Sequence, residues 1–189
     1  MIRAAIEDAR ASGALIQLER GFASARFVNG YVVALGDELV AVHQFHDFYD
    51  EGWVVVRIDD VLEVNRDGPQ RHFEACFRGE GLAPRPLPCA VDLASMQAAL
   101  RSLRPRGALM FVECEAPDAD DDATFLGRLV DVTDLHGTVR QLDALGQWDP
   151  PVAVALGRIT RLQLDTPFCR TFAKYAAPYP VDAGPADGR

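Results

Sequence analysis

The chain has 189 residues, of which 49% are hydrophobic, and its 28 acidic and 19 basic residues give a formal net charge of −9. This composition can supply a buried core and is typical of a soluble globular protein, whereas the acidic balance disfavours sequence-independent binding to nucleic acid, whose phosphates attract basic surfaces. Charged residues interrupt the only stretch near the start that could resemble a secretory signal, and no apolar run approaches the length of a membrane span, so we expect a cytoplasmic protein with no membrane partner.

The first half of the chain predicts a helix followed by five short strands. Apolar residues at helical spacing favour a helix over residues 1–12, which Gly13 ends. Strands rich in apolar and β-branched residues are expected at 14–19, 25–35, 39–45, 53–58 and 61–64. A Gly-Asp-Glu turn is expected to fold the second of these strands onto the third. A helical turn over 72–78, which places Phe73 and Phe77 on one side, completes this half.

A proline-rich linker and a second set of one helix and five strands follow. Residues 79–92 are expected to form the linker, because proline disrupts both helices and strand pairing. Asp92 is expected to cap a helix whose apolar face is shared by Leu93, Met96, Leu100 and Leu103. The second set of strands is expected at 108–114, 124–132, 136–142, 152–156 and 159–164. The tail from residue 178 is rich in proline, glycine, alanine and aspartate and is expected to be disordered.

The two halves match each other at a spacing of roughly 95 residues, which predicts a tandem duplication, because shorter periods would instead indicate a solenoid or propeller. Gly30 and Gly127 fall at corresponding places in the second strand of each set, and a Phe-x-x-x-Phe pair ends both sets. The domain boundaries that follow are 1–78 for the first unit, 79–92 for the linker, 93–177 for the second unit and 178–189 for the tail.

The order of these elements resembles the Sm-like fold, a small SH3-type barrel. The segments that carry the resemblance are Gly30 to Asp37, Ile58 to Val64, Gly127 to Asp134 and Leu156 to Leu162. The resemblance implies a mainly β protein made of two tandem Sm-like five-stranded barrels, each preceded by a helix. It also implies RNA binding and assembly through strand edges. The Asn that follows the turn Asp in RNA-binding members is absent here, so the resemblance supports the fold rather than the RNA function.

A metal or acid–base site could involve His43, His46 and Asp50, which have suitable side chains. If residues 39–45 form a strand, the two histidines lie on opposite faces, because their separation is odd and side chains alternate along a strand. They would converge only after a bend at Phe45. An exposed or partly packed pair at a strand end is therefore the simpler interpretation.

Two other features are candidates for binding. The run Asp118 to Asp122 could coordinate calcium, but it lacks the glycine and the distal glutamate of an EF-hand loop, so a solvated acidic loop is the simpler interpretation. Trp148 is expected in a loop, where a large ring with one donor could anchor a protein partner or pack against the neighbouring barrel. Trp53 enters an apolar strand and is expected in the core.

No catalytic motif is present, and we expect a non-enzymatic binding or scaffolding module that acts through protein contacts. The alternatives are a divergent Sm-like RNA-binding protein that uses Arg158 and Arg161, and a metal-dependent activity at His43 and His46. A homodimer built from free strand edges is also open. The four cysteines include no Cys-x-x-Cys pair, so we expect free thiols and no cofactor.

Overall fold

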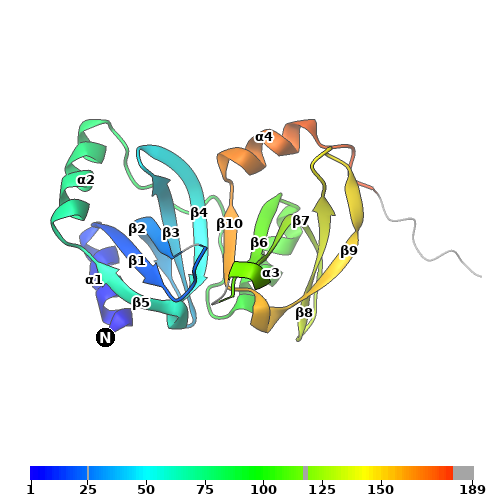
Figure 1. Ribbon diagram of the computed structural model, residues 1–189, viewed down its shortest axis with the longest axis horizontal. Coiled ribbons are helices and arrows are strands. Elements are labelled where there is room, and N and C mark those ends of the chain that lie inside the picture. Colours follow the sequence, from blue (N-terminus) through cyan, green and yellow to red (C-terminus); the bar gives the residue numbers. More distant parts are fainter. Residues whose placement is uncertain (25, 117–118, 181–189) are drawn as a thin grey trace, which may run out of the picture.

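The computed structural model describes residues 1–24, 26–116 and 119–180, whose ten strands form one antiparallel sheet (Figure 1). The strands are β1 Leu15–Arg20, β2 Phe27–Leu35, β3 Leu39–His46, β4 Tyr49–Arg57, β5 Val61–Asn65, β6 Met110–Cys114, β7 Ala123–Val132, β8 His136–Leu142, β9 Trp148–Ala155 and β10 Arg161–Leu164. The α-helices are α1 Ile2–Ser12, α2 Gly68–Gly79, α3 Met96–Leu103 and α4 Pro167–Tyr175. Short 3-10 turns lie at η1 Ile58–Asp60, η2 Arg104–Arg106, η3 Ala119–Asp121 and η4 Leu156–Arg158.

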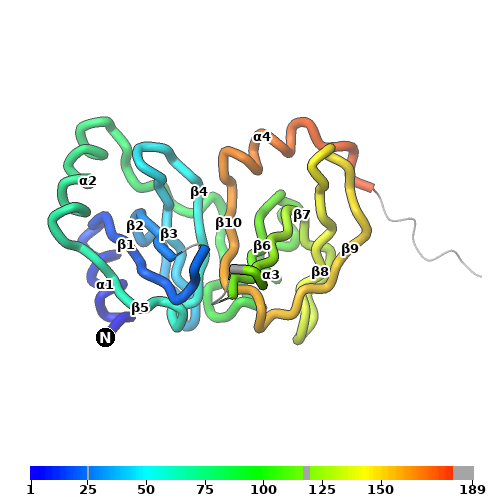
Figure 2. Tube along the Cα trace, viewed as in Figure 1, coloured from blue at the N-terminus to red at the C-terminus, as the bar shows by residue number. Residues whose placement is uncertain are grey.

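The strands follow the spatial order β5-β1-β2-β3-β4-β10-β6-β7-β8-β9, which makes the sheet open rather than closed. The predicted pair of closed barrels is therefore wrong, and the tandem duplication built on them is not shown. The physical reason lies at the centre of the sheet, where β10 pairs with β4 on one side and β6 on the other (Figure 2). The apolar edge of β4 is thus covered by β10, and does not close on β5.

Most predicted helices and strands are confirmed within a few residues of their expected positions. Two strands begin earlier than expected, because β4 starts at Tyr49 and β9 at Trp148. The cap of α3 was predicted wrongly. The side chain of Ser95 accepts a hydrogen bond from the amide of Ala98 at 3.1 Å and begins the helix, whereas Asp92 accepts from the amide of Ala94.

The core lies on both faces of β3 and β4. Alternate residues of these strands point to opposite faces, and both sets are buried. One set packs with α1, and its members from the two strands are Val40, Val42, Val54 and Val56. The other set packs with α3 and with strands of the second half, and comprises Leu39, Ala41, Trp53 and Val55. Burial on both faces explains why β4 reads as a continuous apolar run.

The end of the described chain also lies on the sheet. The amide of Ala177 donates to the carbonyl of Gly146 at 2.8 Å, and the Tyr179 ring contacts Trp148. The expected disordered tail falls, from residue 181 onward, outside the described residues. Within the described residues, no helix is long and apolar enough to cross a membrane.

Candidate functional site

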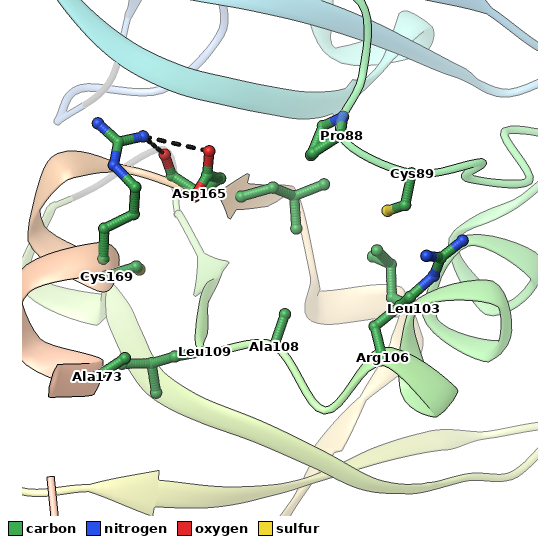
Figure 3. Close-up of a pocket in the computed structure, with 11 residues that line it drawn as sticks. Pro88, Cys89, Leu103, Arg106, Ala108, Leu109, Asp165, Cys169 and Ala173 are labelled. Carbon is green, nitrogen blue, oxygen red and sulfur yellow. Dashed lines mark hydrogen bonds and ion pairs between the residues drawn. The ribbon is translucent and has the colours of Figure 1, made fainter.

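A cavity of about 340 Å³ opens between the linker, α3, the start of β6 and α4 (Figure 3). Its lining is mainly apolar, with Pro88, Cys89, Leu103, Ala108, Leu109, Leu164, Cys169 and Ala173. Segments far apart in the sequence meet here because β10 is inserted between β4 and β6, which brings α4 next to the linker. The volume lies at the lower end of the range of ligand pockets, roughly 300–1,000 Å³.

Three charged side chains lie at the edge of the cavity, and they differ in their partners. Arg170 donates to the Asp165 side chain at 3.2 Å and also to the Asp165 carbonyl. Arg106 stands on the opposite side of the cavity from Asp165 (Figure 3). Across the part of the chain that the structure describes, the Arg106 side chain makes no hydrogen bond and no ion pair. The cavity therefore offers an apolar interior with one available positive charge.

The turn between β10 and α4 positions this side of the cavity. Asp165 adopts the left-handed conformation, with φ of 50°, which an aspartate tolerates better than most residues. Thr166 then caps α4, because its hydroxyl accepts a hydrogen bond from the Cys169 amide at 3.0 Å. Pro167 follows at the first position of the helix, where its missing donor is harmless. This turn and helix cap orient α4 so that Cys169 and Ala173 line the cavity.

Both cysteines of the cavity are free thiols. They face it from opposite sides (Figure 3). Burial raises the pKa of the Cys169 thiol, so this group stays neutral near neutral pH and is a weak nucleophile. The chemistry that these walls support is therefore apolar contact.

An aromatic surface on α4 and β6 adjoins the cavity. Phe168 stacks on Phe172 with 4.9 Å between ring centroids, and Phe111 lies 5.6 Å from Phe168. Phe168 is 51% exposed although it is large and apolar. We call Phe111, Phe168 and Phe172 the aromatic shelf. The cavity and the shelf share α4, since Cys169 and Ala173 lie on the neighbouring side of the same helix.

The histidines of the predicted metal site do not converge. His43 is fully buried, and its Nε2 lies 3.2 Å from Oδ1 of Asp50. His46 is exposed at the end of β3, and its side chain is 4.0 Å from Asp47. Across the described part of the chain, no three His, Cys, Asp or Glu side chains come together in an arrangement that could hold a metal ion.

The tryptophans have different surroundings. Trp53 is 3% exposed and belongs to the core, as expected. Trp148 begins β9 instead of lying in a loop, and its Nε1 donates to the carbonyl of Ala177 at 2.8 Å. Arg128 covers the Trp148 ring at 5.2 Å. The Trp148 donor is thus satisfied within the chain, which leaves only part of its ring for a partner.

The acidic loop is described only from residue 119 onward, since Asp118 lies outside the described residues. Asp122 accepts a hydrogen bond from the Ala116 amide at 2.7 Å and another from the Ser24 hydroxyl. These bonds hold the pKa of the Asp122 carboxyl below its usual value, because they favour its ionised form. Through the Asp122 side chain, the loop is thus hydrogen-bonded both to the segment that follows β6 and to the turn before β2.

Of the two predicted RNA-contacting arginines, only Arg158 is exposed, and it donates to the Asp121 carbonyl at 3.4 Å. Arg161 is buried on β10, where its Nε lies 3.2 Å from Oε2 of Glu113 and its Nη2 donates to Gln44 at 3.2 Å. Burial lowers the pKa of the Arg161 guanidinium, whereas the negative charges of Glu113 and Glu115 raise it. The positive charge of Arg161 is therefore paired with a glutamate inside the protein.

Arg161 is part of a larger buried ion network that sequence analysis missed. Arg20 on β1 donates to both carboxylate oxygens of Glu115, one of them at 3.0 Å, and the Arg20 side chain is fully buried. Thr160 donates to the same carboxylate at 2.8 Å. The network connects β1 and β3 to β6 and β10, and it fastens the two halves of the sheet together. The sequence signal that could have indicated this network was the presence of charged residues within otherwise apolar strands.

No family model, no curated protein and no solved structure matches this chain.

Proposed function

We propose that this protein is a non-enzymatic binding module whose cavity accepts apolar side chains of a protein partner. The observation that carries the proposal is the apolar cavity with Arg106 at its edge. Burying apolar side chains of a partner there would remove apolar surface from water. A neighbouring carboxylate of the partner would pair with Arg106, and the aromatic shelf would widen the contact beyond the cavity.

The aromatic shelf favours a protein over a small ligand. A small molecule needs only the cavity, whereas exposed apolar surface beside a cavity is typical of protein interaction sites. Exposed aromatic side chains such as Phe168 are also enriched where protein partners bind. The edge strand β9 offers a second surface, but one of its adjacent prolines, Pro150 and Pro151, removes a backbone donor from the open edge, because consecutive N–H groups of a strand point to opposite sides. For this reason we favour the cavity over strand addition at β9, and a homodimer through the edges remains a prediction.

A photo-crosslinking amino acid at position 173 tests the proposal. We expect benzoylphenylalanine there to capture a protein in cells, because Ala173 lines the cavity. The same group at position 4, an exposed alanine of α1, is the matched control and should give no specific adduct. Adducts are measured by electrophoresis and by the mass of the purified protein.

Two substitutions show whether the capture depends on the site. Ala108→Trp fills the cavity and should abolish the adduct, and Arg106→Glu should weaken it by reversing the charge. Equal adducts from positions 173 and 4, or adducts that Ala108→Trp leaves unchanged, would contradict the proposal. Adducts with only the mass of a small molecule would assign the cavity to a small ligand instead. RNA recovered with the wild type but lost from Arg158→Ala would favour the RNA-binding alternative.

A further inference from the structure

The linker is fastened to the sheet at Arg85. The Arg85 amide donates to Nδ1 of His43 at 3.1 Å, and Nε1 of Trp53 donates to the Arg85 carbonyl at 3.2 Å. The Arg85 guanidinium pairs with Asp50 and lies 4.5 Å above the Trp53 ring. We call these four residues the clasp. Pro84 and Pro86 on either side of Arg85 restrict the linker to an extended shape.

The clasp requires His43 to be neutral. Because the Arg85 amide donates to Nδ1, that nitrogen carries no proton, and the single proton of the ring is on Nε2, facing Asp50. A second proton would have to be placed on Nδ1. Two N–H groups would then point at each other, and the hydrogen bond that holds the linker would be lost.

The surroundings of His43 oppose that second proton. The ring is fully buried, stacked on Trp53 at 5.2 Å and in edge contact with Phe45 at 4.6 Å. The charged groups that face it are Asp50 on β4, which favours a charged ring, and Arg85 on the linker, which opposes one. On β2, the opposite residue is Tyr31, whose phenol is neutral at these pH values and whose pKa is raised further by burial.

We propose that His43 makes the linker a proton-sensitive strap, which holds Pro88 and Cys89 against the cavity at neutral pH and releases them in acid. Pro88 and Cys89 follow the clasp closely in sequence and form one wall of the cavity. The control of partner binding rests on the proposed function of the cavity. The opening of the strap does not, since it depends only on the clasp.

The direction of the pH effect follows from linkage. Desolvation lowers the pKa of His43 in the clasped state below the ordinary value of 6.5, despite the opposing effect of Asp50. A released strap exposes the ring and restores an ordinary pKa. The released state therefore binds more protons over the interval between the two values. The clasp is fully stable above the ordinary pKa, and it loses stability as pH falls toward the lowered pKa.

Trp53 fluorescence measures the strap directly. In a Trp148→Phe background Trp53 is the sole tryptophan, since the chain contains two. We expect its emission to shift to the red as pH falls from 8 to 5 (roughly spanning the ordinary histidine pKa), while far-UV circular dichroism stays constant. In His43→Asn the amide carbonyl can accept from Arg85 at every pH, so the shift should vanish. His46→Asn, an exposed histidine of the same strand, should retain it.

A shift that persists in His43→Asn would overturn the proposal, and so would its absence from the wild type above the pH of global unfolding. If His43→Asn does not fold, His43→Gln supplies another acceptor without a titrating ring. Crosslinking from position 173 then tests the control of binding, and its yield should fall in acid for the wild type and not for His43→Asn. A normal fluorescence shift with a pH-independent crosslink would reject that control while leaving partner binding intact.

Discussion

Replacing Glu115 with alanine should destabilise the fold more than removal of any surface ion pair. The Glu115 carboxylate binds Arg20 through both of its oxygens, and the two side chains are 5% and 0% exposed. Removing one partner of a buried pair typically costs about 3–5 kcal/mol, because the remaining charge keeps its desolvation penalty without the compensating attraction. We expect a loss of that size in the free energy of unfolding, measured by urea denaturation with circular dichroism.

Two comparisons separate the ion pair from other effects of the substitution. The Arg20→Met, Glu115→Leu double variant should recover most of the loss, since apolar residues of similar volume often replace a buried pair at little cost. Arg26→Ala removes an exposed pair with Glu19 and should cost at most about 1 kcal/mol. A Glu115→Ala variant as stable as Arg26→Ala would show that the network contributes little to the connection between β1 and β6.

The elements of the fold could be predicted because they depend on local patterns. Val40, Val42, Val54 and Val56 are β-branched residues in short apolar runs, and such runs form strands whatever their partners. The spacing of Phe168 and Phe172 likewise indicated α4. The residues of a strand, in contrast, do not indicate which other strand will pair with its edge. The apolar run of β4 could equally have closed on β5 or paired with β10, and only the whole chain decides between them.

The candidate site could not be predicted for a related reason. Its walls are ordinary apolar residues such as Leu103 and Leu164, whose types indicate burial but not a neighbouring cavity. Arg106 follows the end of α3, where a cation ordinarily complements the exposed carbonyls, so its type and place in the sequence do not indicate a site. The sequence signal for the clasp was an arginine, Arg85, between two prolines. Its partner His43 was predicted instead as a candidate for a metal or acid–base site. The cavity depends on the pairing of β4 with β10, and the clasp on the path of the linker across β3 and β4, neither of which the sequence alone specifies.

Gly30→Ala should disrupt the pairing of β2 with β3. A Cβ at this position of β2 would lie 2.1 Å from the carbonyl oxygen of His43 and 2.7 Å from Cγ1 of Val42. The nearest atom belongs to the backbone of β3, so no side-chain rotation can relieve the clash and the two strands must separate. We expect a loss at or above the usual range for overpacking, about 1–3 kcal/mol, measured by thermal and urea unfolding.

Gly157→Ala is the matched control, because a Cβ there has no atom within 4 Å and its stability should change by less than about 0.5 kcal/mol. Gly127→Ala provides an independent repetition, since its Cβ would lie 2.3 Å from the Arg140 carbonyl on β8. If Gly30→Ala and Gly157→Ala were equally stable, β2 and β3 would have to be farther apart than the structure places them. In Gly30→Ala the Arg85 amide, which donates to the His43 ring, should also exchange with solvent faster than in the wild type, because separation of β3 from β2 displaces the clasp.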